Sequence, residues 1–184
     1  MSPFDPALRD EILASVPSLR AFAISLSGNV DRADDLVQET LLRAFANIRS
    51  FRPGTNLPAW LFTILRNLFR SEYRKRRREV PDSDGAFAAT LTSHADQISH
   101  LDFEDFRTAL DKLPPDQREA LVLVGASGFS YEEAADICGC AVGTIKSRVN
   151  RARKRLGDLL AIETVEDFGP DRPTRAVLLA GDLP

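Results

Sequence analysis

Apolar residues recur three or four positions apart over much of the chain, which is the spacing of one face of an α-helix. One such face comprises Leu57, Trp60, Leu61, Ile64, Leu65 and Leu68. An earlier segment repeats the spacing at Leu36, Val37, Thr40, Leu41, Ala44 and Phe45. No segment shows the sustained alternation of apolar and polar residues that indicates a β-strand. The pattern therefore predicts an all-α fold.

A stretch without basic residues separates two helical regions of the chain. Residues 80–105 contain several acidic residues but no Lys or Arg, which indicates an acidic linker with room for some local helix. We expect one small helical domain over residues 1–79, a flexible linker over 80–105 and a second small helical domain over 106–161. Residues 162–184, which contain Pro and Gly, form a tail whose role is open.

The segment SYEEAADICGCAVGTIKSRVNRARKRL has the spacing of a helix-turn-helix. It begins at Ser130, and Glu133 lies three residues later, which is the pattern of a capping box at a helix start. Gly139 suits the left-handed conformation that ends a helix and allows a tight turn. The two helices are expected over residues 131–138 and about 142–156.

Positive charge is concentrated on the second of these helices, although the chain as a whole is slightly acidic. The chain has 24 Lys and Arg residues against 27 Asp and Glu, a net charge of −3. Helices of this kind enter the major groove of DNA, where Arg or Lys pairs with guanine and Asn with adenine. The alternative is a solvated basic face on a structural helix, but the helix-turn-helix context favours DNA. The candidate DNA-binding residues are Thr144, Lys146, Ser147, Arg148, Asn150, Arg151 and Arg155.

A second basic segment, RNLFRSEYRKRRRE, continues the apolar face that contains Trp60, and aromatic residues lie among its charges. Basic side chains can follow a nucleic-acid backbone while aromatic rings stack on unpaired bases. The alternative is that the aromatic residues belong to the core, which we favour for Trp60 and Phe69. Phe51 and Asn67 flank a turn-forming loop and could form a pocket for a base taken out of the duplex. The candidates in this region are Phe51, Asn67, Arg70, Arg74 and Arg77.

Two basic surfaces on separate domains suggest two binding sites on one DNA duplex. Residues 80–105 could span roughly 85 Å when fully extended, at about 3.3 Å per residue. Sites two helical turns apart are separated by about 68 Å. The linker is therefore long enough for both domains to bind at once.

Other classes of function find little support in the sequence. Cys138 and Cys140 lack further ligands at zinc-binding spacing, because the two histidines, His94 and His100, lie in the expected linker. We favour a small apolar packing role for Cys138. No cluster of nucleophile, base and orienting group appears, and no Gly-rich phosphate loop, so we expect no enzymatic activity, no cofactor and no metal. No apolar run long enough to span a membrane and no secretory signal is present, which favours a cytoplasmic protein.

Three stretches resemble the extracytoplasmic-function (ECF) sigma factors of bacterial RNA polymerase, the smallest members of the sigma-70 family. DRADDLVQETLLRAF (31–45) is similar to the helix that docks on the polymerase clamp. SFRPGTNLPAWLFTILRNLFRSEYRKRR (50–77) is similar to the loop and helix that recognise and melt the −10 promoter element. LPPDQREALVLVGASGFSYEEAADICGCAVGTIKSRVNRARKRL (113–156) is similar to the domain that reads the −35 element. The three stretches occur in the order that the family requires.

The resemblance implies a role for particular residues and three partners: core RNA polymerase, promoter DNA and an anti-sigma factor. Phe51 and Asn67 match positions that help to hold the flipped −10 base. The residues that match the −35 reading surface are Lys146, Ser147, Asn150 and Arg151. The residues that would face the basic clamp helices of the polymerase are Asp34, Asp35, Gln38 and Glu39.

The sequence looks most like the alphaproteobacterial general-stress subgroup of this family, in which an anti-sigma protein holds the factor inactive and a sigma-mimicking response regulator releases it. Two other readings stay open. An ordinary helix-turn-helix regulator would not need the module at residues 31–79, and a sigma mimic that only binds an anti-sigma factor would not need a basic recognition helix. For the free protein the sequence leaves open whether the chain is compact; in a compact form the acidic linker would lie near the basic helices, held by surface charge that salt would screen.

Overall fold

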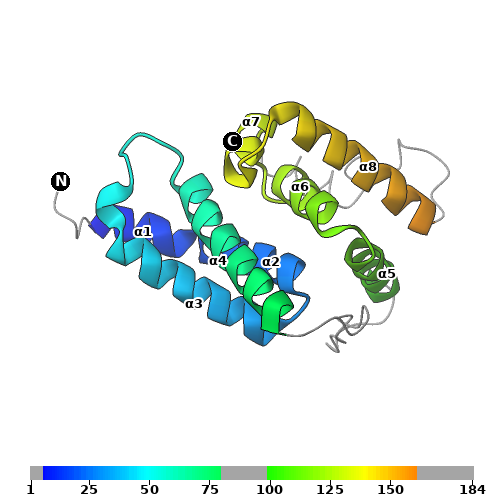
Figure 1. Cartoon of the computed structure of the whole chain (residues 1–184), viewed down its shortest axis with the longest axis horizontal. Coiled ribbons are helices and arrows are strands. Elements are labelled where there is room, and N and C mark those ends of the chain that lie inside the picture. The colour runs from blue at the N-terminus through cyan, green and yellow to red at the C-terminus, as the bar shows by residue number, and fades with distance from the viewer. Residues whose placement is uncertain (1–5, 80–98, 161–184) are drawn as a thin grey trace.

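The computed structural model describes residues 6–79 and 99–160, and within these ranges the chain is helical with no strand (Figure 1). This confirms the all-α prediction. The first group of helices comprises α1 (Pro6–Ala14), α2 (Val16–Ser27), α3 (Val30–Ala46), a 3₁₀ turn (Ile48–Ser50) and α4 (Leu57–Glu79). The second group comprises α5 (Ser99–Asp111), α6 (Pro115–Gly125), α7 (Tyr131–Cys138) and α8 (Val142–Leu160).

Helices α2, α3 and α4 pack side by side to form the core of the first group (Figure 1). The apolar face expected on α4 is largely internal, since Leu61, Leu65 and Leu68 are buried. The rings of Phe22 on α2 and Phe62 on α4 stack with centroids 4.9 Å apart. These contacts hold α4 in place along its whole apolar side, which leaves its other sides free for different tasks.

The connection between α2 and α3 is short because two adjacent residues end one helix and begin the next. Gly28 adopts a left-handed conformation with φ of 65°, which a residue without Cβ reaches at little cost. The Asn29 side chain accepts a hydrogen bond from the Arg32 backbone N–H and so caps α3. This turn sets α3 against α2 and presents the acidic start of α3 at the surface.

The second group contains the predicted helix-turn-helix, formed by α7 and α8. Ser130 and Glu133 make both hydrogen bonds of the capping box, and Gly139 ends α7 with φ of 60°. The bounds of α7 are those expected from the sequence, and α8 extends to Leu160, beyond the expected end. The apolar side of α8 is buried against α6 and α5 through Ile145, Val149, Ala152 and Leu156.

Helix α5 begins earlier than the sequence analysis expected. It starts at Ser99, inside the segment assigned to the linker, and the remaining linker residues 80–98 lie outside the described residues. Acidic residues near its start favour a helix N-terminus, and Ala109 and Leu113 then pack on α8. The linker between the two helical groups is therefore shorter than residues 80–105.

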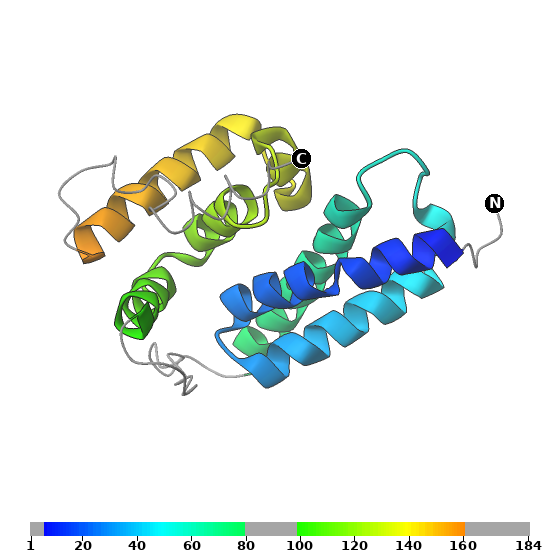
Figure 2. The same ribbon diagram turned by 180° about the vertical axis from the view of Figure 1, so that it is seen from behind.

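The two groups of helices pack against each other, as the views from both sides show (Figures 1 and 2). Phe62 on α4 meets Phe129, just before α7, with ring centroids 4.8 Å apart. Arg66 on α4 forms an ion pair with Glu119 on α6. The two groups are thus in contact, through the buried Phe62, Arg66 and Glu119 and also through the more accessible Asn56 and Glu133. The expected position of the acidic linker lies outside the described residues.

We predict that Ser130→Ala lowers the free energy of unfolding of the helix-turn-helix by about 1 kcal/mol, because the Glu133 backbone N–H loses its acceptor. Chemical unfolding followed by circular dichroism measures this change. Ser130→Thr keeps the hydroxyl acceptor and serves as the control. Equal losses in both variants would show that the cap hydrogen bond is not the cause.

Candidate nucleic-acid interface

Helix α8 separates its apolar and basic side chains onto different sides. Because Ile145, Val149, Ala152 and Leu156 are all buried, the residues between them in the helical repeat are turned outward. The exposed residues of this outer side are Lys146, Asn150, Arg151, Arg153, Lys154 and Arg155. The structure therefore presents most of the predicted DNA-binding residues of α8 to solvent as one basic surface.

The remaining candidates on α8 are less accessible. Thr144 and Ser147 are half-buried. The Arg148 guanidinium lies 3.1 Å from the Asp116 carboxylate of α6 and 3.8 Å from the Cys140 sulfur, and its side chain is 22% exposed. Arg148 thus holds α8 to α6, and it would have to leave Asp116 to contact DNA.

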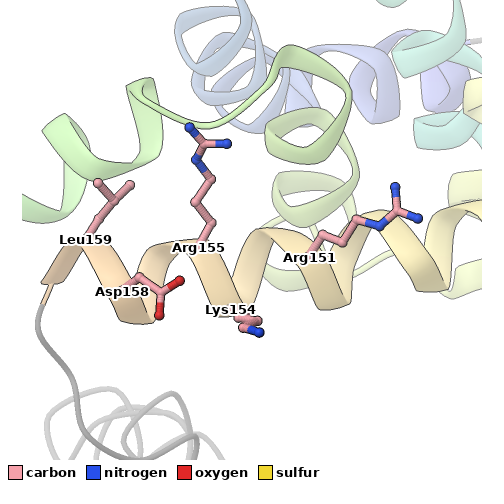
Figure 3. Close-up of a pocket in the computed structure, with 5 residues that line it drawn as sticks. All are labelled: Arg151, Lys154, Arg155, Asp158 and Leu159. Carbon is pink, nitrogen blue, oxygen red and sulfur yellow. The ribbon is translucent and has the colours of Figure 1, made fainter.

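The C-terminal half of α8 borders an open depression of about 440 Å³ lined by Arg151, Lys154, Arg155, Asp158 and Leu159 (Figure 3). Figure 3 shows Arg155 and Leu159 extending on the side of α8 that faces the connection between α5 and α6. Three cationic side chains against one carboxylate give this depression a positive character, which suits phosphate oxygens.

Helix α4 carries the second basic surface. Asn67, Arg70 and Arg74 are exposed and lie three or four residues apart, so they share one side of the helix. The side chain of Arg77 lies outside the described residues, although α4 itself continues to Glu79. Arg66, which the sequence placed in the same basic segment, is buried and does not belong to the exposed surface.

Phe51 lies beside the start of α4. Its ring is 5.4 Å from the ring of Trp60, and both side chains are half-buried. Trp60 precedes Asn67 by seven residues, which is about two helical turns, so the two residues lie along the same side of α4. Phe51 therefore contacts the start of the side of α4 that carries Asn67 about two turns further on. Trp60 and Phe69 are partly buried against the core, in line with the packing role favoured from the sequence.

Helix α3 carries the acidic candidates, and the structure separates them by their neighbours. Asp34 accepts hydrogen bonds from Arg20 on α2, with the shorter at 2.6 Å, and this bond lowers the pKa of its carboxyl group. Glu39 pairs with Arg43, one turn later on the same helix, at 2.7 Å. Asp35 and Gln38 are exposed, and no ion pair to Asp35 is found within the described residues.

Two apolar residues of α3 were not identified as surface residues from the sequence. Leu42 and Phe45 are exposed, so Phe45 follows the apolar spacing of this helix but does not lie in the core. With Asp35 and Gln38, these residues follow the helical repeat along one outer side of α3. A helical pattern alone cannot distinguish an apolar residue in the core from one on a surface that another protein covers.

Cys138 occupies a packing position, as expected. It is buried. Its burial, and to a lesser extent the nearby Glu119 carboxylate, raises the pKa of its thiol to about 12. Within residues 6–79 and 99–160, no group of three or more His, Cys, Asp and Glu side chains is arranged to hold a metal ion. None of the helices in these ranges combines the length and apolar character needed to cross a membrane.

Comparisons with known proteins assign a family to both halves of the chain. Sigma-70 region 2 matches residues 12–79, and sigma-70 region 4 matches residues 103–156. The ECF RNA polymerase sigma factor EcfG of Rhodopseudomonas palustris is 76% identical over 176 residues, which cover 96% of this chain and 97% of that protein.

Solved structures agree with this result. The sigma factor RpoE of Bartonella quintana, in a co-crystal with the anti-sigma factor NepR, is 58% identical with a TM-score of 0.79 and is matched over its full length by 87% of this chain. CnrH in complex with the cytosolic domain of CnrY is 28% identical with a TM-score of 0.64, over 86% of this chain and 90% of that chain.

The first group of helices is thus a sigma-70 region 2 and the second a sigma-70 region 4. The chain belongs to the ECF sigma factors of the sigma-70 family. Proteins of this family are transcription initiation factors and not enzymes. Hereafter the helices α1–α4 are called the region 2 domain and α5–α8 the region 4 domain.

We predict that two arginines of α8, three residues apart, affect stability differently. Arg148→Ala removes the contact to Asp116 and lowers the free energy of unfolding by about 1 kcal/mol. Arg151→Ala removes an exposed side chain and changes it by less than about 0.5 kcal/mol. Urea unfolding of both variants measures the difference. If Arg148→Ala is as stable as the wild type, then Arg148 is available to DNA at no cost.

Proposed function

We propose that this chain binds core RNA polymerase and directs it to promoters, with α4 at the −10 element and α8 at the −35 element. The observation that carries the proposal is the presence of two separate exposed basic helix surfaces, one on each domain, in a chain of net charge −3. Phosphate contacts need cations at the binding surfaces only, and the remaining acidic surface limits attraction to DNA elsewhere.

At the −35 element, we assign base reading to the N-terminal half of α8. Side chains there have the donor groups that pair with base edges in the major groove, each good pair contributing about 1–3 kcal/mol of discrimination. The base-reading residues are Lys146, Ser147, Asn150 and Arg151. Thr144, Arg148 and Arg155 would contact the DNA nearby, and Arg155, which lies in the positive depression, suits a phosphate.

At the −10 element, we assign Phe51 and Asn67 to a flipped base and the arginines of α4 to the backbone. The Trp60 ring supports Phe51, and the line from Phe51 to Asn67 follows one side of α4. Arg70 and Arg74 are exposed on that helix, and Arg77 continues the series in sequence. A single strand could therefore follow the basic side of α4 while one base leaves the stack.

The acidic side of α3 is assigned to core RNA polymerase, through Asp34, Asp35, Gln38 and Glu39. These residues differ in how available they are to the polymerase. Asp35 and Gln38 are exposed, whereas Asp34 and Glu39 already form ion pairs with Arg20 and Arg43. The exposed Leu42 and Phe45 continue the same side and would be covered in the complex. We expect Asp35 to contribute more than Asp34 for this reason.

We further propose that an anti-sigma factor controls this chain. Support comes from the likeness to RpoE of Bartonella quintana, whose structure was solved with the anti-sigma factor NepR. The high identity to EcfG supports a place in the general-stress subgroup. Since bacterial RNA polymerase works in the cytoplasm, the proposed function places the chain there.

Transcription in a purified system tests the proposed function. With core polymerase and a library of random promoter sequences, the chain should give initiation at a defined −35 and −10 pair. Arg151→Ala should still initiate, but with relaxed preference at about one −35 base pair. Absence of initiation throughout the library would contradict the proposal, and an unchanged preference would remove Arg151 from base reading.

Docking on the polymerase is tested by charge reversal on α3. Asp35→Lys should weaken binding to core polymerase by at least about tenfold, because it places a cation against a basic partner surface. Asp10→Lys, at an exposed position of α1, is the matched control and should bind as the wild type does. Binding is measured by titration with labelled chain, and circular dichroism checks that both variants fold. Equal affinities for the two variants would exclude Asp35 from the interface.

A further inference from the structure

The contact between the two domains contains a buried ion pair. Arg66 on α4 donates from Nε to Glu119 Oε1 at 2.6 Å and from Nη2 to Oε2 at 3.3 Å, so both carboxylate oxygens are engaged. The two side chains are 5% and 7% exposed. Arg66 and Glu119 belong to different domains, so separation of the domains leaves each side chain without the other.

A second polar contact links the same two domains at the start of α4. The Asn56 side-chain oxygen accepts a hydrogen bond from the Ala59 backbone N–H, while its amide donates to Glu133 at 2.6 Å. The other carboxylate oxygen of Glu133 accepts from the Ser130 backbone N–H. One chain of hydrogen bonds therefore joins the first turn of α4 to the first turn of α7.

Aromatic side chains fill the space between these two polar contacts. Phe62 lies between Asn56 and Arg66 along α4, and its ring touches Phe22 of its own domain and Phe129 of the other. Asn56 and Arg66 are ten residues apart, or about 15 Å along the helix. The region 4 domain thus contacts α4 along a stripe with a polar contact at each end and an aromatic contact between them.

The chemistry of the two ends differs. Glu133 and Asn56 are accessible enough for water to replace their hydrogen bond when the domains separate. A buried arginine or glutamate that loses its partner keeps an uncompensated charge, which strongly disfavours the buried arrangement. Closure of the domains therefore depends on the Arg66–Glu119 pair being complete, because half of the pair favours separation, where water solvates the remaining charge.

The buried pair also lies beside the basic surface of α4. Arg66 precedes Arg70 by one helical turn, so the region 4 domain sits along the flank of the side that carries Arg70 and Arg74. A duplex that follows this side meets the region 4 domain in the closed form. The two DNA surfaces also cannot reach elements two helical turns apart, about 68 Å, while α4 and α7 touch.

We propose that the Arg66–Glu119 pair is a latch that holds the free chain closed and must open before the two domains can bind one promoter. The first part concerns the free chain alone, and the second part rests on the proposed function. Because the pair is buried, salt screens it little, which distinguishes this latch from closure by surface charge on the linker.

Small-angle X-ray scattering of the free, full-length chain tests the latch without polymerase or DNA. Glu119→Gln and Arg66→Gln each leave one buried charge unpaired and should raise the ratio of open to closed chains by about 100-fold, seen as a larger radius of gyration. Glu72→Gln is the matched control: its partner Arg32 lies in the same domain, so the radius should stay at the wild-type value. Circular dichroism verifies that every variant keeps its helices.

Exchange of the two charges separates a specific pair from general damage. The double variant Arg66→Glu with Glu119→Arg should return the radius of gyration toward the wild-type value, and the wild type should keep its radius up to about 0.5 M NaCl. A radius unchanged in both single variants, or a wild type that extends as salt rises, would overturn the proposal. Because no transcription is measured, this result is independent of whether the chain initiates at promoters.

Discussion

The buried contact between Arg66 and Glu119 places a constraint on α4 that the rest of the structure has to meet. One side of this helix packs into its own domain through Leu61, Leu65 and Phe62. The adjoining side receives the region 4 domain, and the side after that carries the exposed Asn67 and Arg70, which we propose contact DNA. A single helix therefore connects the state of the domain contact to the accessibility of a DNA surface. Separation of the domains at this ion pair would therefore uncover the flank of the basic side, with no change needed within the helix.

Basic and acidic side chains lie on different surfaces of the chain, although its net charge is only −3. The two basic surfaces lie on α4 and α8, whereas α3 presents Asp35 and Gln38 beside apolar Leu42 and Phe45. Surfaces of opposite charge thus suit different partners. The basic surfaces suit DNA phosphates, and the acidic side of α3 suits a basic protein surface. Ion pairs such as Arg20–Asp34 and Arg148–Asp116 remove some charges from this division, because their members already have partners.

Features set by neighbouring residues could be predicted from the sequence. The capping box of Ser130 and the end of α7 at Gly139 depend on residues within one or two turns, and both are confirmed. The buried pair of Arg66 and Glu119 could not be foreseen, since 53 residues separate its members and Arg66 resembled the exposed arginines that follow it.

The partners of individual site residues depend on tertiary packing. Sequence reasoning placed Arg148 among the DNA contacts, but its pairing with Asp116 depends on how α6 lies against α8, which no local pattern reports. The exposure of Phe45 could not be predicted for a related reason. Its spacing is that of a core residue, and only the packed structure shows that no other element covers it within the described residues. The helical repeat decides which residues share a side, and tertiary packing decides which side is covered.

We infer that the two domains touch in the free chain and separate to bind one promoter. The most direct test is the distance between spin labels on the exposed sides of α1 and α8, measured by double electron–electron resonance in the free chain and in the complex with polymerase and promoter. We expect a single short distance in the free chain and an increase of several tens of ångströms in the complex, on the scale of two helical turns of DNA, about 68 Å. A promoter complex in which the distance is no longer than in the free chain would contradict this inference.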